Sequence, residues 1–153
     1  QCADAAQDAG MKPEAALKST NYLDTFIAVA PDCPATQGTE PKDSAAPSIA
    51  RRTFTMIRDA PYVHTSDDVI FTVFADRTGI PPHERSAARK EFFSKGRACL
   101  RASDLGKRYG WGIHSDAEGR VALYGMESPE YRTLASGEDV TVTYAMRSKR
   151  KQP

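Results

Sequence analysis

Residues 109–126, YGWGIHSDAEGRVALYGM, contain the clearest pair of neighbouring strands in the chain, and the expected fold follows from them. We predict a first strand over residues 109–114, a turn over 116–119 and a returning strand over 120–126. Gly119 provides the positive φ that such a turn requires. The two strands therefore form an antiparallel hairpin, and the rest of the fold is built around it.

Pairing Ser115 with Arg120 assigns alternate hairpin residues to two faces of the sheet. One face receives Tyr109, Trp111, Ile113, Ala122, Tyr124 and Met126, and the other Gly110, Gly112, His114, Val121, Leu123 and Gly125. Glycines in paired strands weaken a sheet unless a helix or a ligand approaches the backbone closely. Three interpretations stay open: the aromatic face is a stacking platform, the glycine face with His114 lines a shallow pocket, or the aromatic residues only fill a core.

The remaining sequence contains segments typical of strands and of helices. We predict strands over residues 22–30, 68–76 and 140–146, where β-branched and aromatic residues gather. We predict helices over residues 47–60, 81–95 and 129–135, each of which begins with proline. These segments indicate an α+β fold: a mainly antiparallel sheet of about five strands with two main helices packed on one face.

The length of 153 residues and the hydrophobic content of 40% suit a single compact domain. We expect a flexible N-terminal arm over residues 1–20, one α+β domain over 21–147 and a basic C-terminal tail over 148–153. Met11 precedes the first apolar pattern, and we hypothesise that it is the natural start of the chain.

Charge and hydropathy exclude several classes of protein. The 21 basic and 20 acidic side chains nearly cancel, so no overall field favours nucleic acid or a membrane surface. No run approaches the roughly 18 apolar residues of a membrane span, and we expect a soluble, cytoplasmic protein. The three cysteines form no C-x-x-C pair, so we expect neither a disulfide framework, nor a metal site, nor a cofactor.

Cations gather around the hairpin, and they indicate a site for an anion. Between Arg85 and Arg120 there are nine Lys and Arg residues against four Asp and Glu residues. Such a surface attracts phosphate and carboxylate groups, unless it is merely a solvated face. We predict a binding module for a planar, anionic ligand: a nucleotide, another phosphate-bearing small molecule or nucleic acid. The predicted binding residues are Arg101, Lys107, Arg108, Tyr109, Trp111, Arg120 and Tyr124.

Two other functions are open at this stage. One is an enzyme, a hydrolase or transferase acting on an anionic substrate, with Cys99 as nucleophile or His114 as acid or base. Arg97 and Arg101 flank Cys99 and favour its thiolate form, but no motif ties the two candidate catalytic residues together. The other is a homodimer that buries the aromatic face against a second copy of the chain.

Several short blocks stand out along the chain: NY at 21–22, TFIAVAPDCP at 25–34, PY at 61–62, TSDD at 65–68, FFSK at 92–95, CLRAS at 99–103, KRYGWGIH at 107–114, YG at 124–125 and Tyr131. These blocks are similar to those of a family of bacterial and fungal proteins of unknown function. The resemblance spans roughly residues 21–134. It implies one domain that starts near Asn21, and it carries no known activity, cofactor or catalytic residue.

Overall fold

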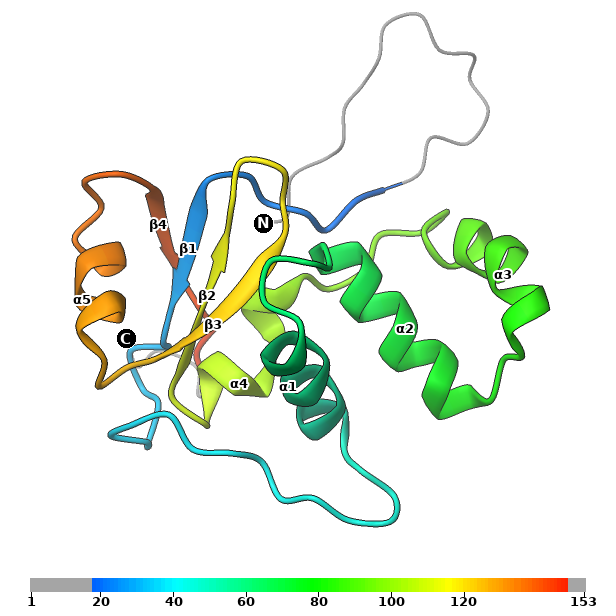
Figure 1. Ribbon diagram of the computed structural model, residues 1–153, viewed down its shortest axis with the longest axis horizontal. Coiled ribbons are helices and arrows are strands. Elements are labelled where there is room, and N and C mark those ends of the chain that lie inside the picture. Colours follow the sequence, from blue (N-terminus) through cyan, green and yellow to red (C-terminus); the bar gives the residue numbers. More distant parts are fainter. Residues whose placement is uncertain (1–17, 149–153) are drawn as a thin grey trace, which may run out of the picture.

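The computed structural model describes residues 18–148, which form one sheet with helices on both of its faces (Figure 1). The strands are β1 (Thr25–Ala28), β2 (Trp111–Ser115), β3 (Val121–Gly125) and β4 (Thr141–Tyr144), in the order β3-β2-β1-β4. β2 is antiparallel to β1 and β3, whereas β4 is parallel to β1. The predicted α+β class is confirmed. The prediction of about five mainly antiparallel strands is not matched: the described residues form a sheet of four strands, with one parallel and two antiparallel pairs.

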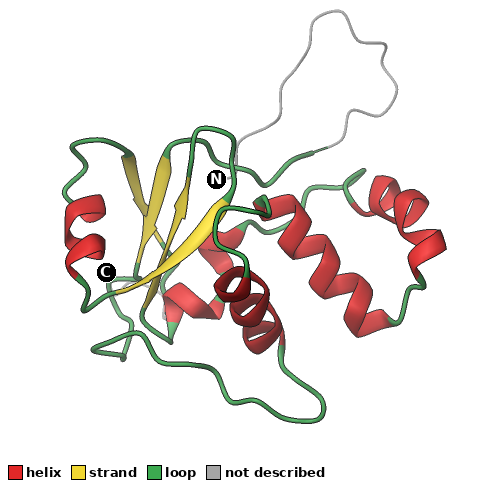
Figure 2. Ribbon diagram, viewed as in Figure 1, coloured by secondary structure: helices red, strands yellow, loops and turns green. Residues whose placement is uncertain are grey.

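The helices of the described residues are α1 (Ile49–Asp59), α2 (Ser66–Thr78), α3 (Arg85–Phe92), α4 (Asp104–Lys107) and α5 (Pro129–Ala135), with 3₁₀ turns η1 (Pro82–Glu84) and η2 (Leu100–Ala102). α1 and α5 confirm two predicted helices. The helix predicted over 81–95 is divided into η1 and α3. Figure 2 shows α5 on one side of the sheet and α1 and α4 on the other, so the expectation of two main helices on one face is also corrected.

The segment predicted as a strand over residues 68–76 is part of α2. A capping box begins this helix: the Thr65 hydroxyl accepts a hydrogen bond from the Asp68 backbone N–H, and the Asp68 carboxylate accepts one from the Thr65 N–H. Gly79 ends the helix in the left-handed conformation, at φ 74°. These local signals favour a helix and outweigh the alternation of side chains in the sequence.

The apolar pattern of α2 resembles that of a strand, because the helix is buried on two sides. Val69 and Val73 join the core under the sheet, whereas Phe71 and Ala75 pack with Phe92 in a second cluster beside α3. A helix that is covered on two sides has no single apolar stripe, so its pattern does not show the helical period.

The hairpin forms where the sequence predicts it, but its register differs by one residue. Ser115 pairs with Val121 rather than with Arg120, so Trp111 lies opposite Gly125 and Gly112 opposite Tyr124. A shift of one residue moves every side chain of one strand to the other face. The predicted aromatic face is therefore divided: Trp111 points to the α1 side of the sheet and Tyr124 to the α5 side.

The central strand β1 is buried on both faces. On the α1 side, Ile27 and Ile113 share the main core with Ile57. On the α5 side, the Phe26 ring packs edge-on against Tyr131, with ring centroids 5.0 Å apart. These two rings cover the backbone at Gly112, which explains why that strand position carries no side chain.

The predicted arm and tail lie mostly outside the described residues. Residues 1–17 and 149–153 are not described, and this range includes Cys2 and Met11. Thr20, at the beginning of the described chain, is 1% exposed and bonds to Asp67 of α2 through its N–H and its hydroxyl, at 2.7 and 2.6 Å. No described helix is both long and apolar enough to cross a membrane.

Candidate functional site

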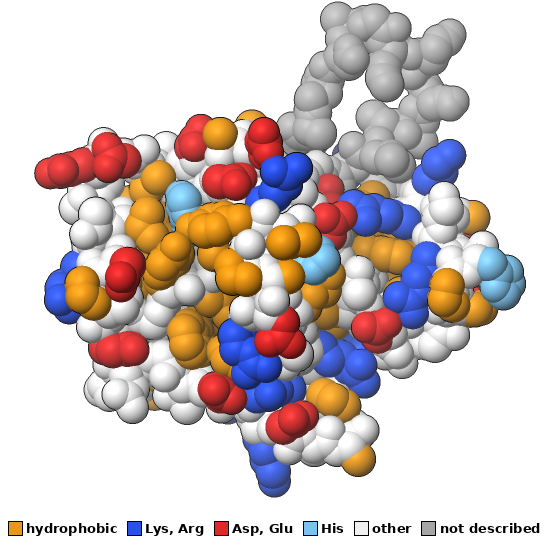
Figure 3. Space-filling view, in the orientation of Figure 1, with side chains coloured by type: hydrophobic (Ala, Val, Ile, Leu, Met, Phe, Trp, Pro, Cys, Tyr) orange, Lys and Arg blue, Asp and Glu red, His pale blue; other side chains and the backbone are white. Residues whose placement is uncertain are grey.

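A hollow of about 430 Å³ lies between the hairpin and α5. The residues that line it are Tyr62, His114, Tyr124, Pro129, Glu130, Thr133 and Leu134. Figure 3 shows hydrophobic side chains gathered over the sheet beside α5, with a histidine at the edge of this group. The hollow combines apolar walls with a few polar groups, as small-molecule sites commonly do.

Three side chains of the hollow form a continuous chain of hydrogen bonds. The Tyr62 hydroxyl lies 2.8 Å from His114 Nδ1 and 2.7 Å from the Tyr124 hydroxyl. The Tyr62 and His114 rings meet edge to face, with centroids 5.6 Å apart. Within residues 18–148, His114 Nε2 has no hydrogen-bond partner. The outer end of the imidazole is therefore available to a ligand.

Burial shifts the pKa values of His114 and Tyr62, two members of this hydrogen-bonded chain. Partial burial lowers the pKa of His114, although the negative charges of Asp116 and Asp24 act in the opposite direction. Burial, together with the hydrogen bond to Tyr124, raises the pKa of the Tyr62 hydroxyl. The lowered pKa of His114 favours the neutral imidazole at pH 7, and the raised pKa of Tyr62 keeps its hydroxyl protonated. Acidic side chains lie near the hollow: Glu130 lines it, and the charges of Asp116 and Asp24 act on His114.

Tyr62 reaches the hollow because its backbone is held in an unusual conformation. Its φ is 60°, in the left-handed region that side chains other than glycine rarely adopt. The Tyr62 N–H donates to the Val121 carbonyl at 2.9 Å, and the Val121 N–H donates to the His64 carbonyl at 2.9 Å. The loop after α1 is thus fastened to the outer edge of β3. Backbone strain of this kind gathers at functional sites.

Trp111, a predicted stacking residue, lies on the other side of the hairpin, and Tyr109, another, precedes β2. The Trp111 Nε1–H donates to the Thr39 carbonyl at 2.9 Å, and its ring packs against Phe54 with centroids 5.3 Å apart. Tyr109 is half-buried, and its carbonyl accepts from the Thr39 N–H. Trp111 is therefore covered by a loop and by α1 rather than presented as an open platform.

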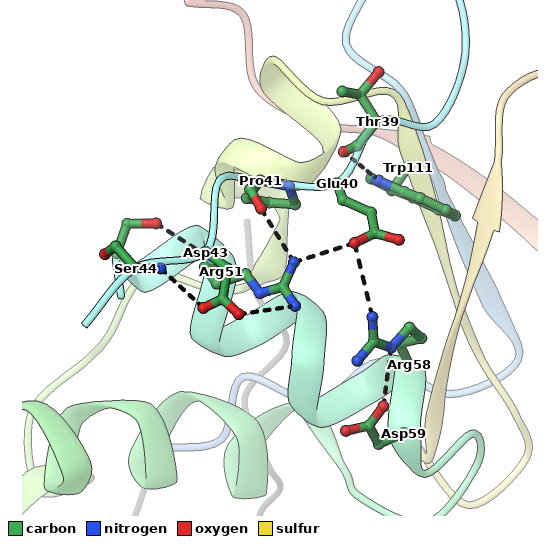
Figure 4. Close-up of polar contacts among 10 residues, drawn as sticks. Thr39, Glu40, Pro41, Asp43, Ser44, Arg51, Arg58, Asp59 and Trp111 are labelled. Atoms are coloured by element: carbon green, nitrogen blue, oxygen red, sulfur yellow. Dashed lines mark hydrogen bonds and ion pairs between the residues drawn. The ribbon is translucent and has the colours of Figure 1, made fainter. Parts of the chain in front are cut away.

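The loop over Trp111 is fixed by charged groups (Figure 4). The Arg51 guanidinium donates to Glu40 at 3.2 Å and to the Pro41 carbonyl at 3.1 Å. The Arg58 guanidinium also lies near Glu40, at 3.8 Å. These contacts join residues 39–43 to α1 and hold the loop across the indole ring.

The cations predicted to hold a phosphate are distributed over several surfaces. The Arg101 Nε–H donates to the Tyr144 carbonyl at 2.7 Å, beside β4. Arg108 pairs with Asp104 at 3.8 Å, and Arg120 pairs with Glu118 in the hairpin turn. Lys107 is half-buried in α4. The 430 Å³ hollow is lined by none of these four residues.

Cys99 and His114 lie on opposite sides of the sheet. Cys99 is 3% exposed, and its sulfur is 3.6 Å from the Tyr22 hydroxyl. Its neighbour Leu100 belongs to the core on the α1 side, whereas His114 faces α5. The structure does not bring these two candidate catalytic residues together. Within residues 18–148, no group of three or more His, Cys, Asp or Glu side chains is arranged to hold a metal ion.

His114 and Tyr124 are among the site residues predicted from the sequence, whereas Tyr62 is not. No hydropathy signal marks this residue, because its role depends on a left-handed backbone and on contacts with two strands far along the chain. The only available signal was the Pro61-Tyr62 pair among the blocks shared with the family of unknown function.

The fold and the hollow together define a small α+β domain with a four-stranded mixed sheet and a half-buried tyrosine–histidine cluster. Residues 17–151 match the family described as "Family of unknown function (DUF6157)", and the chain belongs to this family. No curated protein and no solved structure matches the chain. The function therefore has to be inferred from the site itself.

Proposed function

We propose that this protein is a binding domain for a small planar ligand, which it holds in the hollow between the hairpin and α5. The observation that supports this function best is the chain of hydrogen bonds from Tyr124 through Tyr62 to His114, which ends at a free imidazole nitrogen. The predicted site thereby keeps Tyr124 and His114 and gains Tyr62. Trp111 is no longer part of the proposed ligand contact.

The hydroxyl protons of this chain can point in either of two directions, from Tyr124 toward His114 or the reverse. Each arrangement presents one donor and one acceptor to a ligand. If Tyr124 donates to Tyr62 and Tyr62 to Nδ1, then His114 Nε2 carries a proton and donates outward, while the Tyr124 oxygen accepts. If the direction is reversed, Nε2 accepts and the Tyr124 hydroxyl donates. A planar amide or heterocycle that carries both a donor and an acceptor matches either state.

The ligand predicted from the sequence is both planar and anionic, and the charges around the hollow bear on the second of these properties. Glu130 lines the hollow, and the charges of Asp116 and Asp24 act on His114. These groups favour a neutral or cationic ligand over a phosphate. A planar ligand is therefore supported here. An anionic ligand, a nucleic-acid partner, a homodimer and an enzyme built on Cys99 or His114 stay predictions from the sequence.

The binding test uses NMR spectra of the full chain with four planar probes: uracil, nicotinamide, benzamide and uridine 5′-monophosphate. We expect the neutral probes to shift the amide signals of Ala122, Tyr124 and Thr133, and the phosphate of the nucleotide to weaken binding relative to uracil. If none of the four probes shifts these signals at millimolar concentration, the proposed function is wrong.

A matched pair of variants locates the binding in the hollow. Tyr62→Phe keeps the ring but removes both hydrogen bonds, and we expect it to weaken probe binding by roughly tenfold, which corresponds to about 1.4 kcal/mol. Tyr144→Phe removes an exposed hydroxyl from β4 and should leave binding unchanged. If the two variants change the affinity for the probes equally, the probes do not bind in this hollow.

A further inference from the structure

A second hollow, of about 250 Å³, lies on the opposite side of the sheet, among α1, α2, the end of α3 and η2. Its apolar walls are formed by Ile49, Ile70, Val73, Phe74, Phe92 and Leu100. Cys99 also lines it, but the thiol is directed to the Tyr22 hydroxyl at 3.6 Å. The hollow is therefore mainly hydrocarbon in character, and a hydrocarbon group is the natural occupant.

One cation, Arg77, borders this hollow. It follows Val73 and Phe74 by four and three positions on α2, so it lies on the same face one turn further along. The lining contains no Asp or Glu residue, and among residues 18–148 Arg77 makes no ion pair. The preceding Asp76 is engaged by Arg85 at 3.0 Å. Arg77 thus gives the apolar hollow a positive charge that no neighbouring carboxylate neutralises.

A buried hydroxyl provides the second polar group. Thr53 of α1 lines the hollow and is 4% exposed, yet its hydroxyl has no hydrogen-bond partner in the described part of the chain. A buried hydroxyl is normally paired, because an unpaired one loses its hydrogen bonds to water. Every fully buried side-chain nitrogen or oxygen of residues 18–148 has a partner, so the unpaired Thr53 hydroxyl keeps some exposed surface, and the hollow that Thr53 lines is where a ligand can reach it.

We infer that this hollow binds a small amphipathic carboxylate, with its hydrocarbon chain along the apolar walls and its carboxylate at Arg77. The Thr53 hydroxyl donates a hydrogen bond to an oxygen of the ligand. A volume of about 250 Å³ holds roughly eight water-sized groups, which is the size of hexanoate, and the longer chain of octanoate would extend toward the opening. A guanidinium binds a carboxylate more strongly than it binds a neutral hydroxyl, so the charge selects acids over alcohols.

The test compares octanoate with 1-octanol and octylamine, by NMR titration of the full chain. We expect octanoate to shift the amide signals of Val73 and Leu100 and to bind at least tenfold more tightly than the other two compounds. Arg77→Gln should abolish this preference for the acid, whereas Arg132→Gln, a matched change on α5, should preserve it. Thr53→Val keeps the shape of the side chain and should weaken octanoate binding several-fold.

Two outcomes would overturn this inference. If octanoate does not shift the signals of Val73 or Leu100, the hollow does not bind an acyl chain. If octylamine and octanol bind as tightly as octanoate, Arg77 does not select a carboxylate. The proposed planar-ligand site lies on the other side of the sheet, so its reporter residue Thr133 should not respond to octanoate. Failure of one proposal therefore leaves the other intact.

Discussion

Tyr62 and His114 are 52 positions apart in the chain, and their side chains are joined by a hydrogen bond of 2.8 Å. The bond connects the loop after α1 to the middle of the sheet, and Tyr124 extends it to a third element, β3. At one end of this bond is the strained backbone of Tyr62, and at the other is an imidazole whose pKa is lowered by burial. The candidate site is therefore a product of tertiary contacts.

The pKa of His114 should lie below about 6.5, the ordinary value for histidine, because partial burial disfavours the imidazolium ion. A titration of the imidazole Cε1–H signals by NMR measures this directly. A midpoint for His114 at or above about 6.5 would show that the negative charges of Asp116 and Asp24 outweigh burial.

The same shift predicts how stability depends on pH. The unfolded chain takes up a proton at His114 near pH 6.5, whereas the folded chain does so only at lower pH. The stabilisation is therefore complete above about pH 6.5 and is lost as the pH falls through the folded pKa. Urea unfolding at several pH values should show that the free energy of unfolding of the native sequence falls as the pH falls below about 6.5. This dependence on pH should be weaker in His114→Gln.

Replacing Gly112 by alanine should destabilise the protein by about 1–3 kcal/mol, because the site is already filled. A Cβ at this position would lie 2.7 Å from a ring carbon of Tyr131 and closer still to Phe26. Gly96→Ala is the matched control, since its nearest neighbour is 3.9 Å away in a flexible lysine side chain. Chemical denaturation should show a change within about 0.5 kcal/mol for the control.

Tyr131→Phe should destabilise the protein by about 1–3 kcal/mol, because it leaves the buried Val29 N–H without an acceptor. That N–H donates to the Tyr131 hydroxyl oxygen at 2.8 Å and fastens α5 to the end of β1. Tyr144→Phe removes an exposed hydroxyl and serves as the control. If both variants unfold at the same urea concentration, the bond to Val29 does not stabilise the fold.

Thr65→Ala should reduce the free energy of unfolding by about 1 kcal/mol, because it removes the cap of α2. The Thr65 hydroxyl satisfies the Asp68 N–H at 3.1 Å, which would otherwise lack a partner within the helix. Thr72→Ala removes a hydroxyl from the middle of the same helix and should change stability by less than about 0.5 kcal/mol. A larger loss in the Thr72 variant would contradict this account of the cap.

The residues of the site were only partly predicted, because the predicted register of the hairpin differs from the observed one by one residue. Pairing Ser115 with Arg120 placed Trp111 and Tyr124 on one face, and the actual partner, Val121, separates them. The turn residues do not decide between the two pairings, since a glycine with positive φ, such as Gly119, marks the turn but not its register. The choice is made by burial: Ile113 and Val121 fill the core under α1, and His114 then faces α5.

Local signals are sufficient to predict the hairpin, the helices α1 and α5 and the α+β class, because turn glycines, helix-opening prolines and apolar periodicity act over a few neighbouring residues. Long-range packing is needed to make residues 66–78 a helix buried on two sides, to place β4 parallel to β1, and to bring Tyr62 to His114. These features depend on contacts between distant segments. Their free energies come from packing and burial, which no local pattern records.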